Sequence, residues 1–208
     1  TGELAQRYAS CCIAIGISTG GPPALATLFQ SLPLPLPPIV VVQHMPANFT
    51  GPFARRLDSI SPVSVKEAKT GDLLRPNCAY VAPGGRHLSL RPGPQGVVTR
   101  VQDGEPVSGH KPSVDVMMQS AADRFGASCL GVIMTGMGHD GVEGCRAIRA
   151  AGGYILGQDQ ATSDVYGMNR AAYVAGHVDE QFALDDLATL IPRKCLELFG
   201  NAKPAGVR

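Results

Sequence analysis

Short runs of apolar residues alternate along the chain with stretches of helical periodicity. The apolar runs fall at residues 11–17 (CCIAIGI), 39–43 (IVVVQ), 130–134 (LGVIM) and 154–157 (YILG). Helices are expected over residues 22–32, near residues 50–60 and over residues 142–150. A strand that is apolar at successive positions is buried on both faces, and strands separated by helices pair in parallel. The pattern therefore predicts an α/β fold, a doubly wound and mainly parallel β-sheet with helices on both faces.

The middle of the chain has a different pattern. Four short segments, at residues 63–68, 78–82, 87–91 and 97–101, are separated by turns that contain glycine and proline, such as APGG and RPGPQG. Segments of this length between such turns are typical of hairpins. We therefore expect a small antiparallel hairpin region, either inserted in the sheet or placed at its edge.

Two further helices are predicted in the second half of the chain. Val114, Met117, Met118, Ala121 and Phe125 recur at the spacing of a single helix face, and Ser113 before them is a suitable N-cap. Residues 184–199 also have a helical pattern, in which Pro192 is expected to cause a kink or a break. Residues 201–208 are expected to fray.

Composition narrows the class of protein. Hydrophobic residues make up 44% of the 208 residues and charged residues 17%, which is enough apolar material for the core of a single domain. The formal net charge of +1 argues against nucleic acid as a partner, because no basic field covers the surface. Aromatic residues are only 5% and tryptophan is absent, so a base-stacking platform is not expected either.

The sequence also bears on the compartment. No apolar run approaches the ~18 residues of a membrane span, so no membrane insertion is expected. The first ten residues (TGELAQRYAS) lack the basic start and apolar stretch of a signal peptide. The six cysteines form no C-x-x-C pair, so they are interpreted as buried, reduced thiols of a cytoplasmic protein rather than metal ligands.

Three reactive residue types follow three of the predicted strands. Ser18 comes after the first, His44 after the second and Asp140 after the third. Ligands of open α/β sheets bind beyond the carboxyl ends of parallel strands, so we expect these side chains at one sheet edge. A serine hydroxyl becomes a nucleophile when an imidazole accepts its proton and a carboxylate orients that imidazole. The sequence therefore predicts a Ser-His-Asp triad.

Each of these residues also has a simpler interpretation. Ser18, before Gly20 and Gly21, has the position of a helix N-cap or phosphate cradle. His44 fits a packed histidine at a strand end, and Asp140 fits a turn residue. Among the other charged residues, His110 is a candidate for lining the cleft and His139 for the base. His87 and His177 are expected at the surface or at strand ends, and Lys111 and Arg170 are candidates for contacting an acidic macromolecule.

A second motif points to another chemistry. Residues 136–141 (GMGHDG) follow a predicted strand, open a helix and match G-x-G-x-x-G, and Asp159 lies where a ribose-binding acid is expected. A nicotinamide-dependent, dinucleotide-binding oxidoreductase is therefore an alternative hypothesis. This alternative gives Ser18 and His44 no role.

The longer motifs, taken in order, resemble the CheB family of chemotaxis protein-glutamate methylesterases. They are residues 14–22 (AIGISTGGP), 43–46 (QHMP) with Phe49 and Thr50, 82–88 (APGGRHL), 110–115 (HKPSVD), 135–141 (TGMGHDG) and 158–168. The resemblance covers roughly residues 11–200, which would form the methylesterase catalytic domain.

The resemblance implies a serine hydrolase that needs neither metal nor organic cofactor. Ser18 would be the nucleophile, His44 the general base and acid, and Asp140 the orienting carboxylate. The backbone N–H of Met137 would help to bind the oxyanion, and Thr19 would help to hold the histidine. The reaction would be hydrolysis of glutamyl methyl esters on the cytoplasmic helices of chemoreceptors, accompanied by deamidation of receptor glutamines.

The resemblance also has gaps. Family members carry an N-terminal receiver domain, which is not in this chain. Residues 1–10 would then be a linker remnant, and the first residue, Thr1, fits a chain that starts upstream. Ile17, Asp164 and Asn169 depart from the family pattern, and the last two, in a loop near the cleft, put substrate preference in doubt. A catalytically inactive adaptor paralogue is a further hypothesis.

Overall fold

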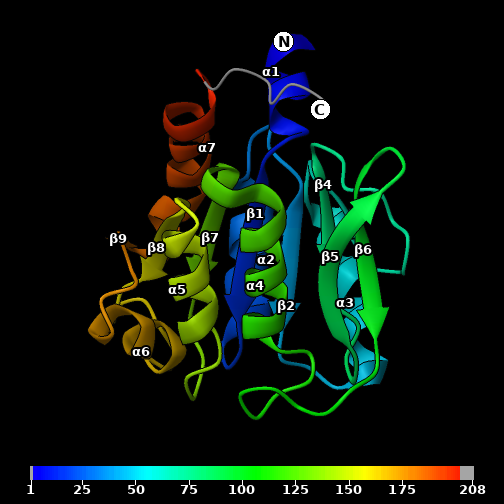
Figure 1. Ribbon diagram of the computed structural model, residues 1–208. Helices are drawn as coiled ribbons and strands as arrows, with labels where there is room; N and C mark the ends of the chain where they lie inside the picture. Colours follow the sequence, from blue (N-terminus) through cyan, green and yellow to red (C-terminus); the bar gives the residue numbers. More distant parts are fainter. Residues whose placement is uncertain (1, 202–208) are drawn as a thin grey trace.

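A seven-stranded parallel sheet forms the centre of the computed structural model, which describes residues 2–201 (Figure 1). The strand order is β3-β4-β2-β1-β7-β8-β9, and each neighbouring pair is parallel. The strands are β1 (Cys12–Ile17), β2 (Ile39–Gln43), β3 (Ser64–Glu67), β4 (Cys78–Val81), β7 (Cys129–Ile133), β8 (Tyr154–Gln158) and β9 (Glu180–Phe182). The predicted fold class is confirmed.

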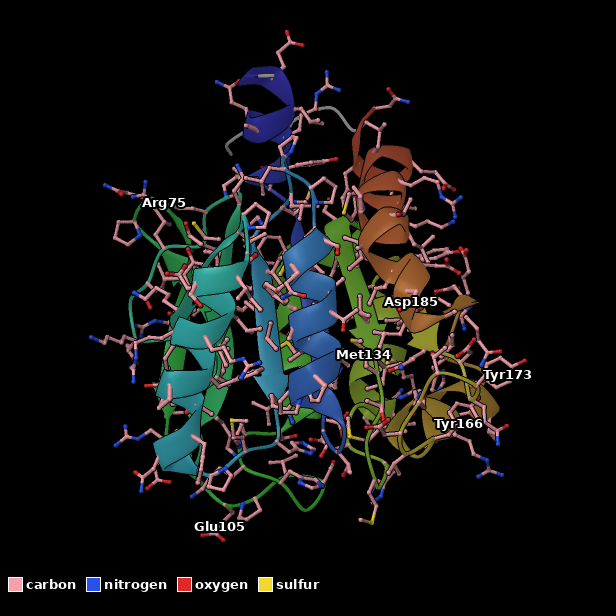
Figure 2. All side chains as sticks on the ribbon, turned by 180° about the vertical axis from the view of Figure 1, so that it is seen from behind. Arg75, Glu105, Met134, Tyr166, Tyr173 and Asp185 are labelled. Carbon is pink, nitrogen blue, oxygen red and sulfur yellow. The ribbon has the colours of Figure 1, made fainter. Side chains whose placement is uncertain are left out.

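Helices cover both faces of the sheet. The three in front of it in Figure 1 are α4 (Val114–Phe125), α5 (Val142–Ala150) and α6 (Met168–Val174). The opposite face, seen in Figure 2, carries α2 (Gly21–Ser31), α3 (Ala47–Ile60) and α7 (Leu187–Phe199). A short helix, α1 (Gly2–Tyr8), lies beside the C-terminal end of the described chain (Figure 1).

The central strand shows why the apolar runs have no polar interruptions. Ile13, Ile15 and Ile17 of β1 pack in the core under α2, α3 and α7. Cys12 and Ala14, which alternate with them, pack in the core under α4, α5 and α6. Successive side chains of a strand point to opposite faces, so a sheet covered on both sides needs apolar residues at every position.

The antiparallel region is smaller than predicted. Within residues 2–201, only β5 (His87–Gly93) and β6 (Gly96–Gln102) form a hairpin, and it packs outside the main sheet. The expectation that residues 63–68 and 78–82 belong to hairpins is wrong, because β3 and β4 join the main sheet in parallel. Short strands have the same residue pattern in either orientation. Here the connection between them is long enough to return the chain to the same end of the sheet.

Both ends of the described part of the chain are helical. Residues 2–8, expected as a linker, form α1, whose Tyr8 is buried in the main core, and the Arg7 guanidinium donates to the carbonyl of Gly200. The last helix begins at Leu187 and continues without a break through Pro192. Because proline has no backbone N–H, the helix lacks one internal hydrogen bond there. Residues 202–208 of the predicted tail lie outside the described residues. No helix in residues 2–201 has the length and apolarity needed to cross a bilayer.

Candidate active site

Three adjacent strands bring the predicted site residues to one edge of the sheet. In the strand order β2-β1-β7, the loop after each strand carries one of them: His44 after β2, Ser18 after β1 and Asp140 after β7. Ser18, His44 and Phe49 line one open hollow of about 390 Å³, together with Thr19, Gly20, Pro22, Gln43, Met45 and Pro46. The expected convergence of serine and histidine at the strand ends is therefore present.

Asp140 is completely buried and holds His44. Its Oδ2 lies 2.7 Å from Nε2 of His44. It also accepts from the backbone N–H groups of Val114 (2.7 Å) and Asp115 (2.9 Å) and from the hydroxyl of Ser113 (2.9 Å), at the start of α4. Burial acts to raise the pKa of Asp140, but the hydrogen bonds from His44, Asp115 and Val114 outweigh it and leave the pKa lowered. Asp140 is therefore ionised at neutral pH.

The ionised carboxylate fixes the tautomer of His44. A carboxylate can only accept, so the nitrogen that faces it, Nε2, carries the proton. The other nitrogen, Nδ1, is buried and has no hydrogen-bond partner within residues 2–201. The Ser18 hydroxyl makes no hydrogen bond to His44 in that part of the chain, although both residues line the hollow. Nδ1 thus keeps a free lone pair, on a residue that lines the same hollow as Ser18.

A second histidine stacks on the first. The rings of His44 and His110 are nearly parallel, at 7°, with their centroids 3.6 Å apart. Burial, and next the neighbouring His44, lower the pKa of His110, so its ring is neutral at neutral pH. His110 was expected to line the cleft; it is not one of the residues that line the hollow, and its ring instead covers one face of His44.

Hydrogen bonds from both neighbouring strands hold the Ser18 loop. Its N–H donates to the carbonyl of Thr135 (2.9 Å), and its carbonyl accepts from the buried side chain of Gln43 (2.9 Å). The Thr135 hydroxyl donates to the carbonyl of Thr19 (2.9 Å). A Cβ on Gly136 would lie 2.7 Å from Cβ of Ser18, so only glycine permits this approach of the β7 loop. The serine is therefore fixed between the β2 and β7 loops.

Met137 and Thr19 are the two residues that the resemblance gives a supporting role. Met137 follows Gly136, and its side chain is 66% exposed beside the Ser18 loop. Its backbone N–H donates to no other group in residues 2–201. Thr19 lines the hollow, but in the same part of the chain its hydroxyl makes no hydrogen bond to His44. Their expected roles, oxyanion binding by the Met137 N–H and support of the histidine by Thr19, remain a proposal.

Other sequence expectations are corrected or narrowed. His87 is at the start of β5, but it is buried rather than at the surface: its Nδ1 accepts from the N–H of Ser113 (3.2 Å), and its Nε2 bonds the carbonyl of Glu105 (2.8 Å). His139 is exposed, while His44 is the residue that contacts Asp140. Lys111 pairs with Asp103 at 2.8 Å.

The glycine-rich loop after β7 is already occupied by a side chain of the protein. Asp115 accepts from the N–H groups of Gly141 (2.9 Å) and Gly144 (2.7 Å), at the start of α5. A dinucleotide phosphate would need those donors. Asp159 likewise binds the N–H of Thr162 at 3.0 Å within its own loop. The G-x-G-x-x-G motif is therefore a structural turn. Sequence reasoning assigned no role to Asp115, although it lies in the HKPSVD motif.

Asn169 and Ile17, two of the residues that depart from the family pattern, are both buried. Asn169 is buried, and its amide donates to the carbonyl of Gln158 and to the hydroxyl of Ser163, both at 2.8 Å. It therefore holds the loop after β8. Ile17 is buried in the core. Within residues 2–201, no group of three or more His, Cys, Asp and Glu side chains is arranged to hold a metal ion.

An α/β sheet with a serine and a hydrogen-bonded His–Asp pair at its central strand ends defines a class, the α/β proteins with a site of the serine-hydrolase type. The sequence model of the family described as CheB methylesterase matches residues 13–191. The chain belongs to the CheB methylesterase family.

Similar proteins agree with this assignment. A protein-glutamate methylesterase/protein-glutamine glutaminase of Treponema denticola is 52% identical over 182 residues, which are 87% of this chain and 49% of that protein. One of the same name from Moorella thermoacetica is 50% identical over 86% of this chain and 43% of its own length. The crystal structure of the Thermotoga maritima CheB methylesterase catalytic domain superposes with a TM-score of 0.84 at 36% identity, covering 90% of this chain and 98% of that one. The chain spans about half the length of the curated relatives it matches.

Proposed function

We propose that this protein is a serine esterase that removes methyl groups from γ-glutamyl methyl esters on the cytoplasmic helices of chemoreceptors, and that it deamidates receptor glutamines. The names of its relatives support this substrate class. The observation that carries the proposal is the 2.7 Å contact between His44 and Asp140 beside a hollow that Ser18 also lines. That arrangement suits acyl transfer through an activated hydroxyl.

The proposed mechanism starts with proton transfer to Nδ1 of His44, because Nε2 already donates to Asp140. Ser18 Oγ loses its proton to Nδ1 and attacks the ester carbonyl carbon, and the carbonyl oxygen takes the negative charge. The Met137 N–H stabilises that oxyanion, and Thr19 helps to hold the imidazolium. Asp140 remains ionised and stabilises the positive ring throughout.

The second half of the reaction reverses the roles. The tetrahedral intermediate collapses, the carbon–oxygen bond to the methoxy group breaks, and the proton on Nδ1 leaves with it as methanol. Water then gives a proton to Nδ1 and attacks the acyl carbon of the acyl-enzyme. The bond from that carbon to Ser18 Oγ breaks, Nδ1 returns its proton to Oγ, and the glutamic acid product leaves and loses its own proton to solvent. With a glutamine side chain the leaving group is ammonia. No step in this sequence calls on a metal or an organic cofactor.

The proposal extends to the rest of the protein. Residues 11–200 would form the catalytic domain, and a phosphoryl-accepting receiver domain would occupy the part of the longer relatives that this chain does not span. We propose a cytoplasmic location, which is consistent with six free thiols.

Methanol release from a methylated receptor preparation tests the proposal. We expect Ser18→Ala to reduce the rate by at least ~10³-fold with an unchanged circular dichroism spectrum. Ser31→Ala, at the exposed end of α2, is the matched control and should keep full activity. Full activity of Ser18→Ala would overturn the assignment.

Two further measurements address the other hypotheses. An activated ester should give a burst of leaving group equal to the enzyme concentration, because the acyl-enzyme accumulates, whereas an inactive adaptor would give none. NAD or NADP should not raise the melting temperature, since Asp115 occupies the donors that a phosphate would need.

A further inference from the structure

The hollow that contains Ser18 continues as a groove between two helices. Pro22, at the start of α2, lines both this hollow and a second one of about 280 Å³. The second hollow is also lined by Pro23 of α2 and by Phe53 and Arg56 of α3. Figure 2 shows α2 and α3 side by side on this face of the sheet. We call the two hollows together the α2–α3 groove.

One face of α3 forms the wall of this groove. Phe49, Phe53 and Arg56 are spaced i, i+4 and i+7, so they lie along one stripe of the helix. At 1.5 Å per residue the stripe is about 10 Å long and leads away from the catalytic edge. Phe49 is 60% exposed, although it is a large apolar side chain next to the Ser18 hollow. The groove is thus apolar next to the site and cationic at its far end.

The cation at the end of the groove is free to bind a partner. Arg56 is exposed, and no carboxylate in residues 2–201 lies within ion-pair distance of its guanidinium. A polypeptide that places a glutamyl ester at Ser18 must lay its neighbouring residues on the surface beside the hollow. A chain with an apolar side chain near the ester and a carboxylate further away would complement this surface.

We propose that the α2–α3 groove binds the substrate helix next to the reacting glutamyl ester, and this inference rests on the proposed function. An apolar residue about one helical turn from the ester packs on Phe49 and Phe53. A carboxylate about two turns, or seven residues, from the ester pairs with Arg56. The groove therefore selects which glutamyl positions are hydrolysed.

Two synthetic helical peptides test this inference. Both carry one γ-methyl glutamate at the centre and leucines about one turn away on either side. The first has glutamate seven residues from the ester on both sides, and the second has lysine at those positions. Methanol release should be about fivefold faster in kcat/KM for the glutamate peptide, the scale of one exposed ion pair together with the repulsion that lysine introduces.

Charge reversal on the enzyme identifies the residue responsible. Arg56→Glu should abolish or invert the preference between the two peptides. Arg124→Glu is the matched control: it makes the same change of net charge at an exposed position of α4, on the opposite face of the sheet, and should keep the preference. Melting temperatures of both variants show that the fold is intact.

The outcomes separate this inference from the proposed function. Equal turnover of the two peptides, or turnover of neither while a methylated receptor fragment is hydrolysed, overturns the groove assignment alone. A preference that Arg56→Glu leaves unchanged also overturns it. A dimer in sedimentation that Arg56→Glu dissociates would assign the groove to a second copy of this chain instead. No methanol from the receptor fragment overturns both proposals.

Discussion

Two buried carboxylates have pKa values shifted in opposite directions: Asp140 accepts hydrogen bonds at the start of α4, and Asp115 accepts them at the start of α5. Hydrogen bonds lower the pKa of Asp140 against the effect of burial, whereas burial raises the pKa of Asp115 in spite of its bonds from Ser108 and Gly144. The N–H of Asp115 itself donates to Asp140. The difference follows from their partners, because Asp140 faces a histidine and Asp115 faces only neutral donors.

Asp140→Asn tests the first of these carboxylates. The amide cannot hold the proton on Nε2 of His44 in the same way, so kcat should fall by ~10⁴-fold. A lowered pKa means that Asp140 stabilises the fold above its unfolded pKa of ~3.9 and that this stability is lost as pH falls through the folded pKa. The free energy of unfolding should therefore decrease less on acidification from pH 7 in the variant than in the wild type, measured by urea denaturation. Asp123→Asn, exposed on α4, should behave like the wild type, and identical acid profiles for all three proteins would refute the assignment.

Asp115→Asn should have the reverse effect on the pH profile. A raised pKa gives a stability contribution that is present below the unfolded pKa of ~3.9 and is lost as pH rises through the folded pKa. The asparagine keeps an acceptor for Gly141 and Gly144 and can donate to Ser108. The variant should therefore gain stability relative to the wild type between pH 4 and pH 7 in urea denaturation at several pH values. Parallel curves would contradict this.

The positions of the candidate triad could be predicted from the sequence, but the residues that hold the triad could not. Ser18, His44 and Asp140 could be placed because each follows a strand with an unmistakable apolar pattern. Gln43 and Asp115 make hydrogen bonds to loops that are distant in the sequence. The residues next to them in the sequence give no sign of these bonds. His87 lies at a strand end, as expected, but its burial was not predictable from the sequence, since its ring bonds residues 105 and 113.

At the scale of elements, the loops after β1, β7 and β8 are joined at a single side chain. The Thr135 hydroxyl donates to the carbonyl of Thr19 and accepts from the N–H of Val165 at 3.0 Å. It is 1% exposed, so water cannot replace it. The position of Ser18 therefore depends on the loop that follows β8.

Thr135→Val tests this connection. Valine has the same shape but leaves the N–H of Val165 without its acceptor, which should cost about 1–3 kcal/mol of unfolding free energy. The loosened Ser18 loop should also lower kcat for methanol release. Thr27→Val, on the exposed part of α2, is the control. A stability equal to that of the wild type would contradict the role of Thr135.

Helices and strands were predictable where the burial of their side chains gives a clear pattern of apolar residues in the sequence. β2 begins and ends where expected, at Ile39–Gln43, and α5 covers Val142–Ala150 as predicted. The direction of β3 and β4 was not predictable, because their few residues alternate in the same way in either orientation. α6 and β9 were missed: they are short, and β9 has a single buried residue, Phe182.

At the scale of the whole molecule, the burial of the cysteines shows how completely the helices and the sheet exclude solvent from the core. Five of the six free thiols are buried, and only Cys78 is partly accessible. Burial raises the pKa of Cys11 to about 11 and that of Cys129 to about 12, so these thiols are not ionised at neutral pH. This agrees with their interpretation as reduced core residues.

Thiol titration tests this enclosure. With Ellman's reagent at pH 8, the native protein should show one fast-reacting thiol and the denatured protein all six, because the reagent requires an accessible thiolate. Cys78→Ser should remove the fast phase and leave the melting temperature nearly unchanged. Several fast thiols in the native protein would mean that the core opens far more easily than its packing indicates.

The position of β1 between β2 and β7 has a consequence for biosynthesis. The first two of these strands leave the ribosome early, whereas β7, which carries the turn with Asp140, follows only after the hairpin and α4 have been made. A nascent chain can thus pair β1 with β2 and display an alcohol and an imidazole that have no counter-ion. Only when β7 has been made can Asp140 reach His44, so the three side chains come together as the middle of the sheet closes.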